Sequence, residues 1–252
     1  MRVSPRWKLL AALSLATLGG CPSPPRPPPP STPPAVPAAP APHIGTPFEI
    51  LPQSSLLTIL VYRGGALASA GHNHVIASHD LSGAIFIPAE ILASSFEVHI
   101  PVATLTVDEA ALRAQQSAAD FPPDVSAGAQ EGTRHNMLGA ALLDAEHSPE
   151  IVLRSLQLEP AGSASPDSAT VRAHVQSTVR GQERTFTVPV RYQQGGNGTL
   201  DASGEFPLRQ SELGLTPFSA MLGALQVQDE MRVSFHIVAQ AAAVKAAPPA
   251  TP

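Results

Sequence analysis

The sequence predicts an all-β protein, an extended antiparallel β-barrel of about eight strands with one or two short helices. Three observations support this fold class: apolar residues alternate along eight segments, turn residues separate those segments, and two segments carry a helical pattern. Strict alternation is typical of strands with one buried face. A two-sheet sandwich would show the same pattern, so patterning alone leaves barrel and sandwich open. The eight segments are residues 57–62, 85–87, 96–103, 151–158, 171–179, 186–192, 200–208 and 231–239.

The clearest turn is the run Gly195-Gly196-Asn197-Gly198. Gly and Asn tolerate the positive φ angles that tight hairpins require. We therefore expect a hairpin that joins a strand ending near Gln193 to one starting near Thr199.

Two segments are predicted to be helical. Residues 108–119 are rich in Ala, Glu and Gln, and residues 133–145 repeat apolar side chains four positions apart, as one face of a helix requires. Pro149 blocks any continuation of the second helix. The intervening residues 120–132 are predicted to form a loop.

The first 20 residues have the features of a secretory signal peptide. Arg2, Arg6 and Lys8 precede a short apolar run, Leu9–Leu18, which is shorter than the about 20 residues needed to span a bilayer. The run ends in Leu18-Gly19-Gly20-Cys21, which resembles a bacterial lipobox. Cys21 is the one cysteine in the chain, and it is predicted to be the lipidated residue that anchors the protein. The alternative is a plain signal peptide with an incidental cysteine.

The remaining chain divides by composition into three parts. Residues 21–47 are dominated by Pro, Ala and Ser and are predicted to be an extended tether. Residues 48–240 are predicted to form the barrel domain, and residues 241–252 a disordered tail. The predicted location is the bacterial cell envelope, with an outer-membrane anchor preferred because Pro22 and Ser23 lack the aspartate associated with inner-membrane retention.

The charge balance excludes nucleic acid as a predicted partner. The chain has 15 basic and 20 acidic side chains, and removing the three basic residues of the signal leaves 12 and 20, a net charge near −8. Nucleic-acid binding favours clustered basic faces, which this sequence lacks. The sequence does not indicate a protein partner.

Paired histidines form the most conspicuous polar motif. His72 and His74 lie two residues apart, so an extended backbone would place both on one face. They could bind Zn²⁺ or Cu²⁺ if His135 or His147 supplied a further ligand. The alternatives are hydrogen-bonded histidines at a barrel mouth, or contact with the polar head of a ligand, for which Arg134 and His135 would be helpers.

Several local patterns resemble the YceI-like family of exported proteins. The most specific is Asn136-Met137-Leu138 followed by Leu143-Asp144-Ala145-Glu146-His147-Ser148-Pro149-Glu150-Ile151 and Ser155. Gly71–Val75, Gly181–Val190 and Phe206–Leu215 are similar to three other stretches of that family. The resemblance covers roughly residues 48–240.

The resemblance implies a lipocalin-like barrel whose apolar cavity holds a polyisoprenoid lipid or an isoprenoid quinone. A barrel of about eight strands either fills with side chains or holds one ligand. Small residues on strand faces would leave room for a ligand if they point inward. The candidates are Ala84, Ala173, Ala202 and Gly204. The candidate apolar contacts are Met137, Phe186, Phe206 and Phe235.

No motif of a known enzyme class was found. The sequence has no G-x-S-x-G, H-E-x-x-H or phosphate-binding glycine loop, so the protein is predicted to be a binding protein without a certain cofactor. The leading hypothesis is a lipid-anchored carrier that encloses an isoprenoid amphiphile. The alternatives are a metal-binding envelope protein that uses the paired histidines and a ligand-free structural or interaction module.

Overall fold

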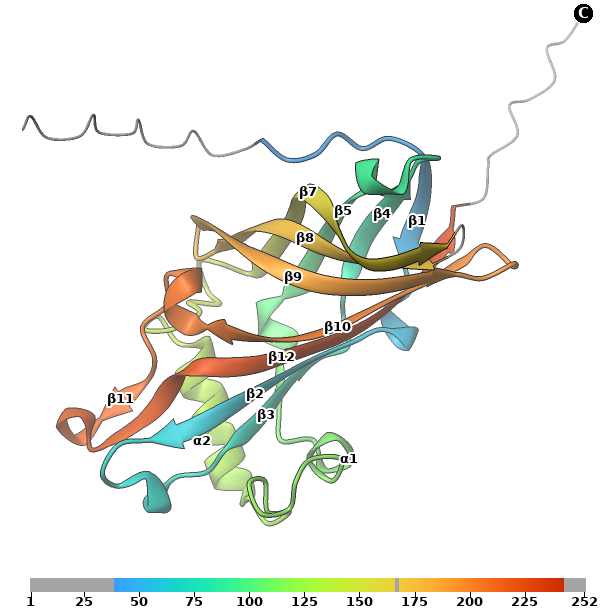
Figure 1. The fold of residues 1–252 in the computed structure, drawn as a ribbon. Coiled ribbons are helices and arrows are strands. Elements are labelled where there is room, and N and C mark those ends of the chain that lie inside the picture. The colour runs from blue at the N-terminus through green and yellow to red at the C-terminus, as the bar shows by residue number, and fades with distance from the viewer. Residues whose placement is uncertain (1–38, 166–167, 243–252) are drawn as a thin grey trace, which may run out of the picture. The chain divides into compact units, whose positions relative to one another are not determined.

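The structure is a computed structural model that describes residues 39–165 and 168–242 (Figure 1). Eight antiparallel strands close into a barrel in the order β1-β4-β5-β7-β8-β9-β10-β12, because β1 pairs with both β4 and β12. The predicted barrel is therefore confirmed, and the sandwich is excluded. The barrel strands are β1 (Thr46–Ile50), β4 (Ser82–Ile87), β5 (Ser95–Pro101), β7 (Glu150–Ser165), β8 (Ser168–Val179), β9 (Gln182–Gln194), β10 (Thr199–Arg209) and β12 (Leu225–Ala241). The signal peptide, Cys21, most of the tether and the tail after residue 242 lie outside the described residues.

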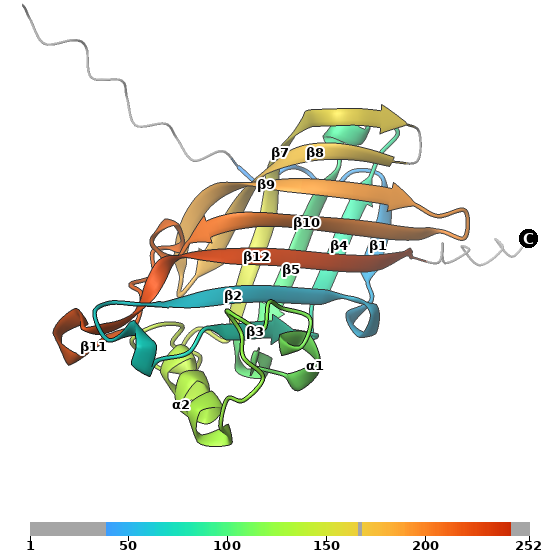
Figure 2. The same ribbon diagram turned by 60° about the horizontal axis from the view of Figure 1, so that its bottom comes forward.

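A three-stranded extension continues the sheet beyond β12 (Figure 2). Strand β12 pairs with β1 only near its end, at Ala239–Ala241, and with β2 (Leu56–Gly64) between Gln226 and His236. The short helix η1 (Pro52–Ser54) separates β1 from β2, so both strands use the same edge of β12. Strands β3 (His74–Ser78) and β6 (Thr106–Val107) follow β2, and the two-residue β11 (Ser219–Ala220) pairs with the start of β12.

Strand β2 is covered on both faces, which explains its nearly continuous apolar sequence. Leu57, Ile59 and Val61 face the barrel interior. Leu56, Leu60 and Tyr62 pack on the other side against a small second core that includes Leu112 and Phe121. A strand that is buried on both faces has apolar residues at successive positions, so apolar and polar residues do not alternate along it.

The helices differ from the predicted ones in both extent and position. Helix α1 covers only Ala110–Arg113, against a predicted helix over 108–119, and α2 covers Ala127–Leu138, against 133–145. Residue Asp108 has a left-handed backbone with φ of 55°, so the first helix cannot begin there. Ser126 caps α2, because its side chain accepts a hydrogen bond from the Ala129 amide.

The end of α2 also differs for a local reason. Gly139 leaves the helix with extended backbone angles, φ −67° and ψ 164°. The predicted loop 120–132 is therefore half wrong, because its second half forms the first turns of α2. Within the described residues, no helix combines the length and apolarity needed to cross a membrane.

The predicted hairpin is confirmed, with β9 ending at Gln194 and β10 starting at Thr199. The Gly195 amide donates to the Thr199 carbonyl over 2.9 Å, and Gly198 has a positive φ of 75°. Gly83 on β4 is a second position that requires glycine. Its φ is 119°, and a Cβ there would lie 2.1 Å from the Glu97 carbonyl oxygen on the neighbouring strand.

The last residues assigned by composition to the tether lie against the barrel wall. The Ala41 amide donates to the Ser155 carbonyl over 2.9 Å, and the Ser95 hydroxyl donates to the Pro42 carbonyl over 3.0 Å. His43 stacks on Phe86 with ring centroids 4.3 Å apart. The chain therefore packs on the barrel several residues before β1 begins.

Candidate ligand-binding lumen

The barrel encloses an apolar cavity of about 230 Å³. Side chains from all eight barrel strands except β1 line it, together with residues from β2, β3 and the segments after α2 and β10. Among the thirty residues that line it, Gln210 is the one polar residue, and its amide nitrogen donates to the Gln228 carbonyl over 2.9 Å. Such a lumen can bind an apolar ligand, or the apolar part of one, but offers no charged group to it.

The four predicted apolar contacts all line this cavity. Phe186 and Phe206, from β9 and β10, stack with ring centroids 6.3 Å apart, and Phe235 from β12 lies on the same wall. Met137 reaches the cavity from the last turn of α2, and Leu142 and Leu143 follow in the turn after it. Helix α2 therefore contributes part of the lining at one end of the lumen.

Of the four small residues considered for inward positions, only some lie on the inner face of the barrel. Ala202 lines the cavity, and Ala173 is fully buried in the adjacent core. Gly204 leaves room for its neighbours rather than for a ligand, because a Cβ there would lie 2.2 Å from the Pro189 carbonyl oxygen and 2.6 Å from the Phe235 ring. Ala84 was wrongly placed: its neighbour Ile85 lines the cavity, so the alternation of β4 turns Ala84 outward.

A second apolar space of about 60 Å³ adjoins the lumen at the end farther from α2. The two spaces share Ile85, Phe96, Val190 and Ala202 as lining residues. Tyr192 borders the second space, and burial raises the pKa of its phenol. A long apolar chain could thus extend past Ala202 toward this end.

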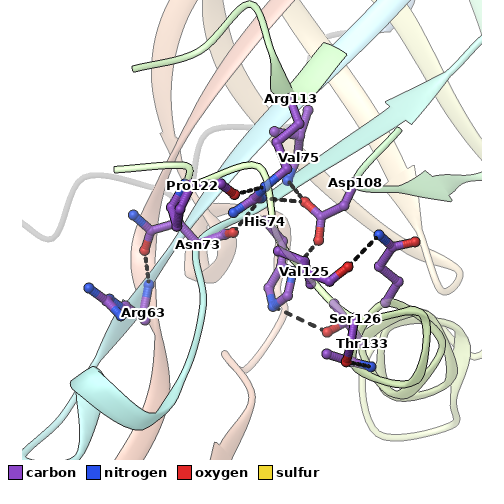
Figure 3. A network of polar contacts seen from close by, with 12 residues as sticks. Arg63, Asn73, His74, Val75, Asp108, Arg113, Pro122, Val125, Ser126 and Thr133 are labelled. Carbon is purple, nitrogen blue, oxygen red and sulfur yellow. Dashed lines mark hydrogen bonds and ion pairs between the residues drawn. The ribbon is translucent and has the colours of Figure 1, made fainter. Parts of the chain in front are cut away.

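A buried ion pair fixes the segments that cover β3 (Figure 3). Arg113 is 2 % exposed and donates from Nη1 to Asp108 Oδ1 over 2.7 Å and to the Asn73 carbonyl over 2.8 Å. Its Nε donates to the Pro122 carbonyl over 2.6 Å. The guanidinium carbon lies 5.6 Å from the centre of the Phe121 ring, which adds a cation–π contact.

Asp108 connects this pair to His74 and thus to α2. His74 Nδ1 lies 2.6 Å from Asp108 Oδ2, and His74 Nε2 lies 3.2 Å from the Thr133 hydroxyl on α2. The Val75 amide donates to Asp108 Oδ1 over 2.9 Å. Three covering segments, α1, the loop before α2 and α2 itself, are therefore held to β3 through one carboxylate.

The environment of Asp108 leads us to expect that the stability of the fold depends on pH. Burial raises the pKa of Asp108, but the hydrogen bonds from His74 and the Val75 amide and the charges of His74 and Arg113 outweigh it and leave the pKa below its ordinary value. The pKa of Glu97 is also lowered, chiefly by its hydrogen bond with Arg154, against the opposing effect of burial. A carboxyl group whose pKa is lower in the folded state stabilises the fold fully at pH values above its unfolded-state pKa. This stabilisation is lost as the pH falls through the folded-state pKa.

We therefore expect the free energy of unfolding to fall steeply below about pH 4, the range in which unfolded Asp and Glu take up protons. Urea unfolding followed by circular dichroism across pH 3–7 measures this. An Asp108→Asn variant should show a shallower decline between these pH values. An equal decline in the variant would contradict the role given to Asp108.

The predicted polar site residues do not converge. His72 is exposed, with its ring centroid 6.1 Å from that of His74, and His135 is exposed on α2. Arg134 donates to the Ala103 carbonyl over 2.6 Å instead of pointing to a ligand, and His147 pairs with Asp144. Within residues 39–165 and 168–242, no group of three or more potential ligands could hold a metal ion.

Gln210, Asp108 and Arg113 were not found from the sequence. Asp108 and Arg113 lie in the segment 108–119 that was predicted to be helical, and a carboxylate and a guanidinium five residues apart give no signal of burial. Gln210 lies within the Phe206–Leu215 run, and nothing in that run marks a polar residue that lines a cavity. For α2, the sequence Pro122-Pro123 followed three residues later by Ser126 is a helix-start signal that could have been used.

A closed antiparallel barrel with an apolar lumen defines the class of lipocalin-like β-barrels. The YceI-like domain model matches residues 65–239, well over half of the chain. The chain therefore belongs to the YceI-like family, as its sequence motifs indicated.

Solved structures agree on the fold. BcnA of Burkholderia cenocepacia superposes with a TM-score of 0.54 at 20 % identity, covering 76 % of this chain and 99 % of that chain. A polyisoprenoid-binding domain from Saccharophagus degradans, described as implicated in plant cell wall breakdown, gives 0.50 at 9 % identity, covering 77 % and 98 %. A comparison with curated proteins finds no match.

Proposed function

We propose that the barrel binds the apolar tail of an isoprenoid-type amphiphile, a polyprenyl lipid or an isoprenoid quinone, within its lumen. The observation that carries the proposal is the chemistry of the lining, which is apolar except for Gln210. Burial of about 100 Å² of tail surface contributes about 2.5 kcal/mol before association costs. The polyisoprenoid-binding domain that shares the fold supports the choice of ligand class.

The lumen offers few polar contacts to the head group of such a ligand. With Arg134 bonded to a main-chain carbonyl and His74 to Asp108, two of the predicted head-group contacts are already engaged. Recognition by the tail is therefore proposed, with the head outside the cavity. The protein acts as a carrier or a reservoir rather than as an enzyme.

Binding of ubiquinone to the purified full-length chain tests this function. The protein is passed through gel filtration with ubiquinone, and the quinone that stays with the protein is extracted and measured by mass spectrometry. We expect retention of ubiquinone and none of a tail-free benzoquinone with the same head group. Failure to retain ubiquinone, with no lipid co-purified from the expression host, would overturn the proposal.

We also propose that Cys21 carries a lipid anchor and that the protein lies in the cell envelope. The support is the match of Leu18-Gly19-Gly20-Cys21 to a lipobox at the position of the one cysteine. In a bacterial host grown with an alkyne-tagged fatty acid, we expect labelling of the chain and its recovery with membranes. The Cys21→Ser variant should lose the label, and labelling of that variant would contradict the proposed anchor.

The metal-binding alternative is not carried forward. His74 uses both ring nitrogens within the protein, and among the described residues no third ligand lies near the pair.

A further inference from the structure

Two neighbouring loops at the start of β12 gather exposed apolar side chains. We define the apolar tip as residues 65–71, between β2 and β3, and residues 218–224, which include β11 and lead into β12. The loops are joined by a hydrogen bond from the Leu67 amide to the Ala224 carbonyl over 2.7 Å, and both views place them next to each other near the β11 label (Figures 1 and 2). Of the six exposed large apolar residues in the described chain, four belong to this tip: Leu67, Phe218, Met221 and Leu222.

At the end of the tip, two residues adopt a backbone conformation that is unfavourable for their residue types. Met221 and Leu222 have left-handed backbones, with φ of 50° and 56°, and Met221 is 68 % exposed while Leu222 is fully exposed. Turn positions of this kind favour Gly or Asn, and a large apolar residue there costs free energy. Two such residues in succession, neither packed in the core, indicate a role outside the fold.

The charge distribution around the tip selects its partner. No charged side chain occurs between residues 213 and 228 or between residues 64 and 71, although the whole chain is acidic. The nearest charge on the β2 side is Arg63, which stands opposite Val227 and donates to the Gly71 carbonyl over 2.8 Å. An uncharged apolar projection, with Arg63 on the β2 side of its base and Asp229 and Glu230 on the β12 side, fits the apolar interface of a bilayer better than a charged partner.

The tip is continuous with the lumen. Leu213 and Leu215, which precede the Phe218–Ala224 loop, and Met231, which follows it on β12, all line the cavity. From these observations we propose that the apolar tip inserts Met221 and Leu222 into a bilayer surface and thereby holds one end of the barrel against the membrane. This inference goes beyond ligand binding, and its test does not require a ligand.

A fluorescent label on the tip tests insertion directly. Because Cys21 is the one cysteine, a Cys21→Ser/Leu222→Cys full-length chain can be labelled at residue 222 alone with the polarity-sensitive dye NBD. With vesicles of phosphatidylethanolamine and phosphatidylglycerol, we expect a blue-shifted, stronger emission that is quenched by lipids brominated in their acyl chains. The matched control is Cys21→Ser/Leu92→Cys, which labels another exposed leucine, in η3 (Ile91–Ala93) between β4 and β5.

The control lies at the far end of the barrel, because η3 adjoins the end of β4 that pairs with Thr46, next to the last residues of β12. We expect no acyl-chain quenching of the label at residue 92. A label at residue 222 that does not respond, or equal quenching at both positions, would overturn the proposal. The comparison is independent of any membrane affinity of the N-terminal segment, because both chains contain it.

A double variant separates a membrane role from a structural one. In the Cys21→Ser background, Met221→Asn/Leu222→Asn should lower vesicle partitioning by about tenfold or more. Its melting temperature should be equal or higher, because Asn adopts the left-handed backbone more readily, and ubiquinone retention should be unchanged. Unchanged partitioning of the variant would overturn the insertion. A lower melting temperature would also contradict it, because it would show that Met221 and Leu222 support the fold.

Discussion

Replacement of Asp108 by alanine is expected to lower the free energy of unfolding by about 3–5 kcal/mol. The change leaves Arg113 charged, buried and without its carboxylate, with the Asn73 and Pro122 carbonyls as its remaining acceptors. It also removes the partner of the Val75 amide and of His74. A charge stranded in the interior costs far more than a lost surface contact.

Urea denaturation at pH 7 measures this effect, with two controls. Glu205→Ala breaks the exposed pair with Arg232, whose two side chains are 56 % and 57 % exposed, and should cost less than about 1 kcal/mol. Asp108→Ala/Arg113→Met removes the stranded charge, so its loss should be smaller than that of Asp108→Ala alone. If Asp108→Ala cost no more than Glu205→Ala, the buried network would not hold the covering segments.

Replacement of Ala202 by phenylalanine is expected to weaken ubiquinone retention by about tenfold or more, through loss of the apolar surface available to the tail. Ala202 borders both the lumen and the smaller space beyond it, so a ring there narrows the connection between them. The ring enters an existing void, so stability should change by less than about 3 kcal/mol, the usual upper cost of overpacking.

The neighbouring residue on β10 provides the control for the added ring. Ser203→Phe places the same ring on the opposite face of the strand, because adjacent side chains alternate. Its ubiquinone retention should equal that of the unaltered chain. Equal retention by Ala202→Phe and Ser203→Phe would show that the tail does not occupy the lumen at this level.

Seven of the eight barrel strands could be predicted because each has one buried face, whereas the five-residue β1, next to the proline-rich segment, was missed. The alternation of Val171, Ala173 and Val175 on β8, for example, reflects a strand with one face buried in the core, as both a barrel and a sandwich would require. The β9–β10 hairpin was predictable because its glycines and asparagine have a steric reason to be there. Strand β3 was missed because His74–Ser78 is buried throughout, which removes the alternation.

The lumen could be anticipated only in part. Phe186, Phe206 and Phe235 were identified from their place on strand faces, but cavity volume depends on how side chains from distant strands meet. Gly204 illustrates the difficulty, because its missing side chain is used by the Phe235 ring. The Asp108–Arg113 pair was not predictable, since its burial depends on β3 and the loop before α2.

The joint between β1 and β12 has a consequence for how the molecule assembles. Phe48 stands opposite Ala241, so the seam unites the first and last strands of the domain. Such a seam cannot form until both ends of the domain have been synthesised, and contacts so distant along the chain make folding slow. A nascent barrel therefore stays open for a time with unpaired strand edges, through which two unfinished chains could pair with each other.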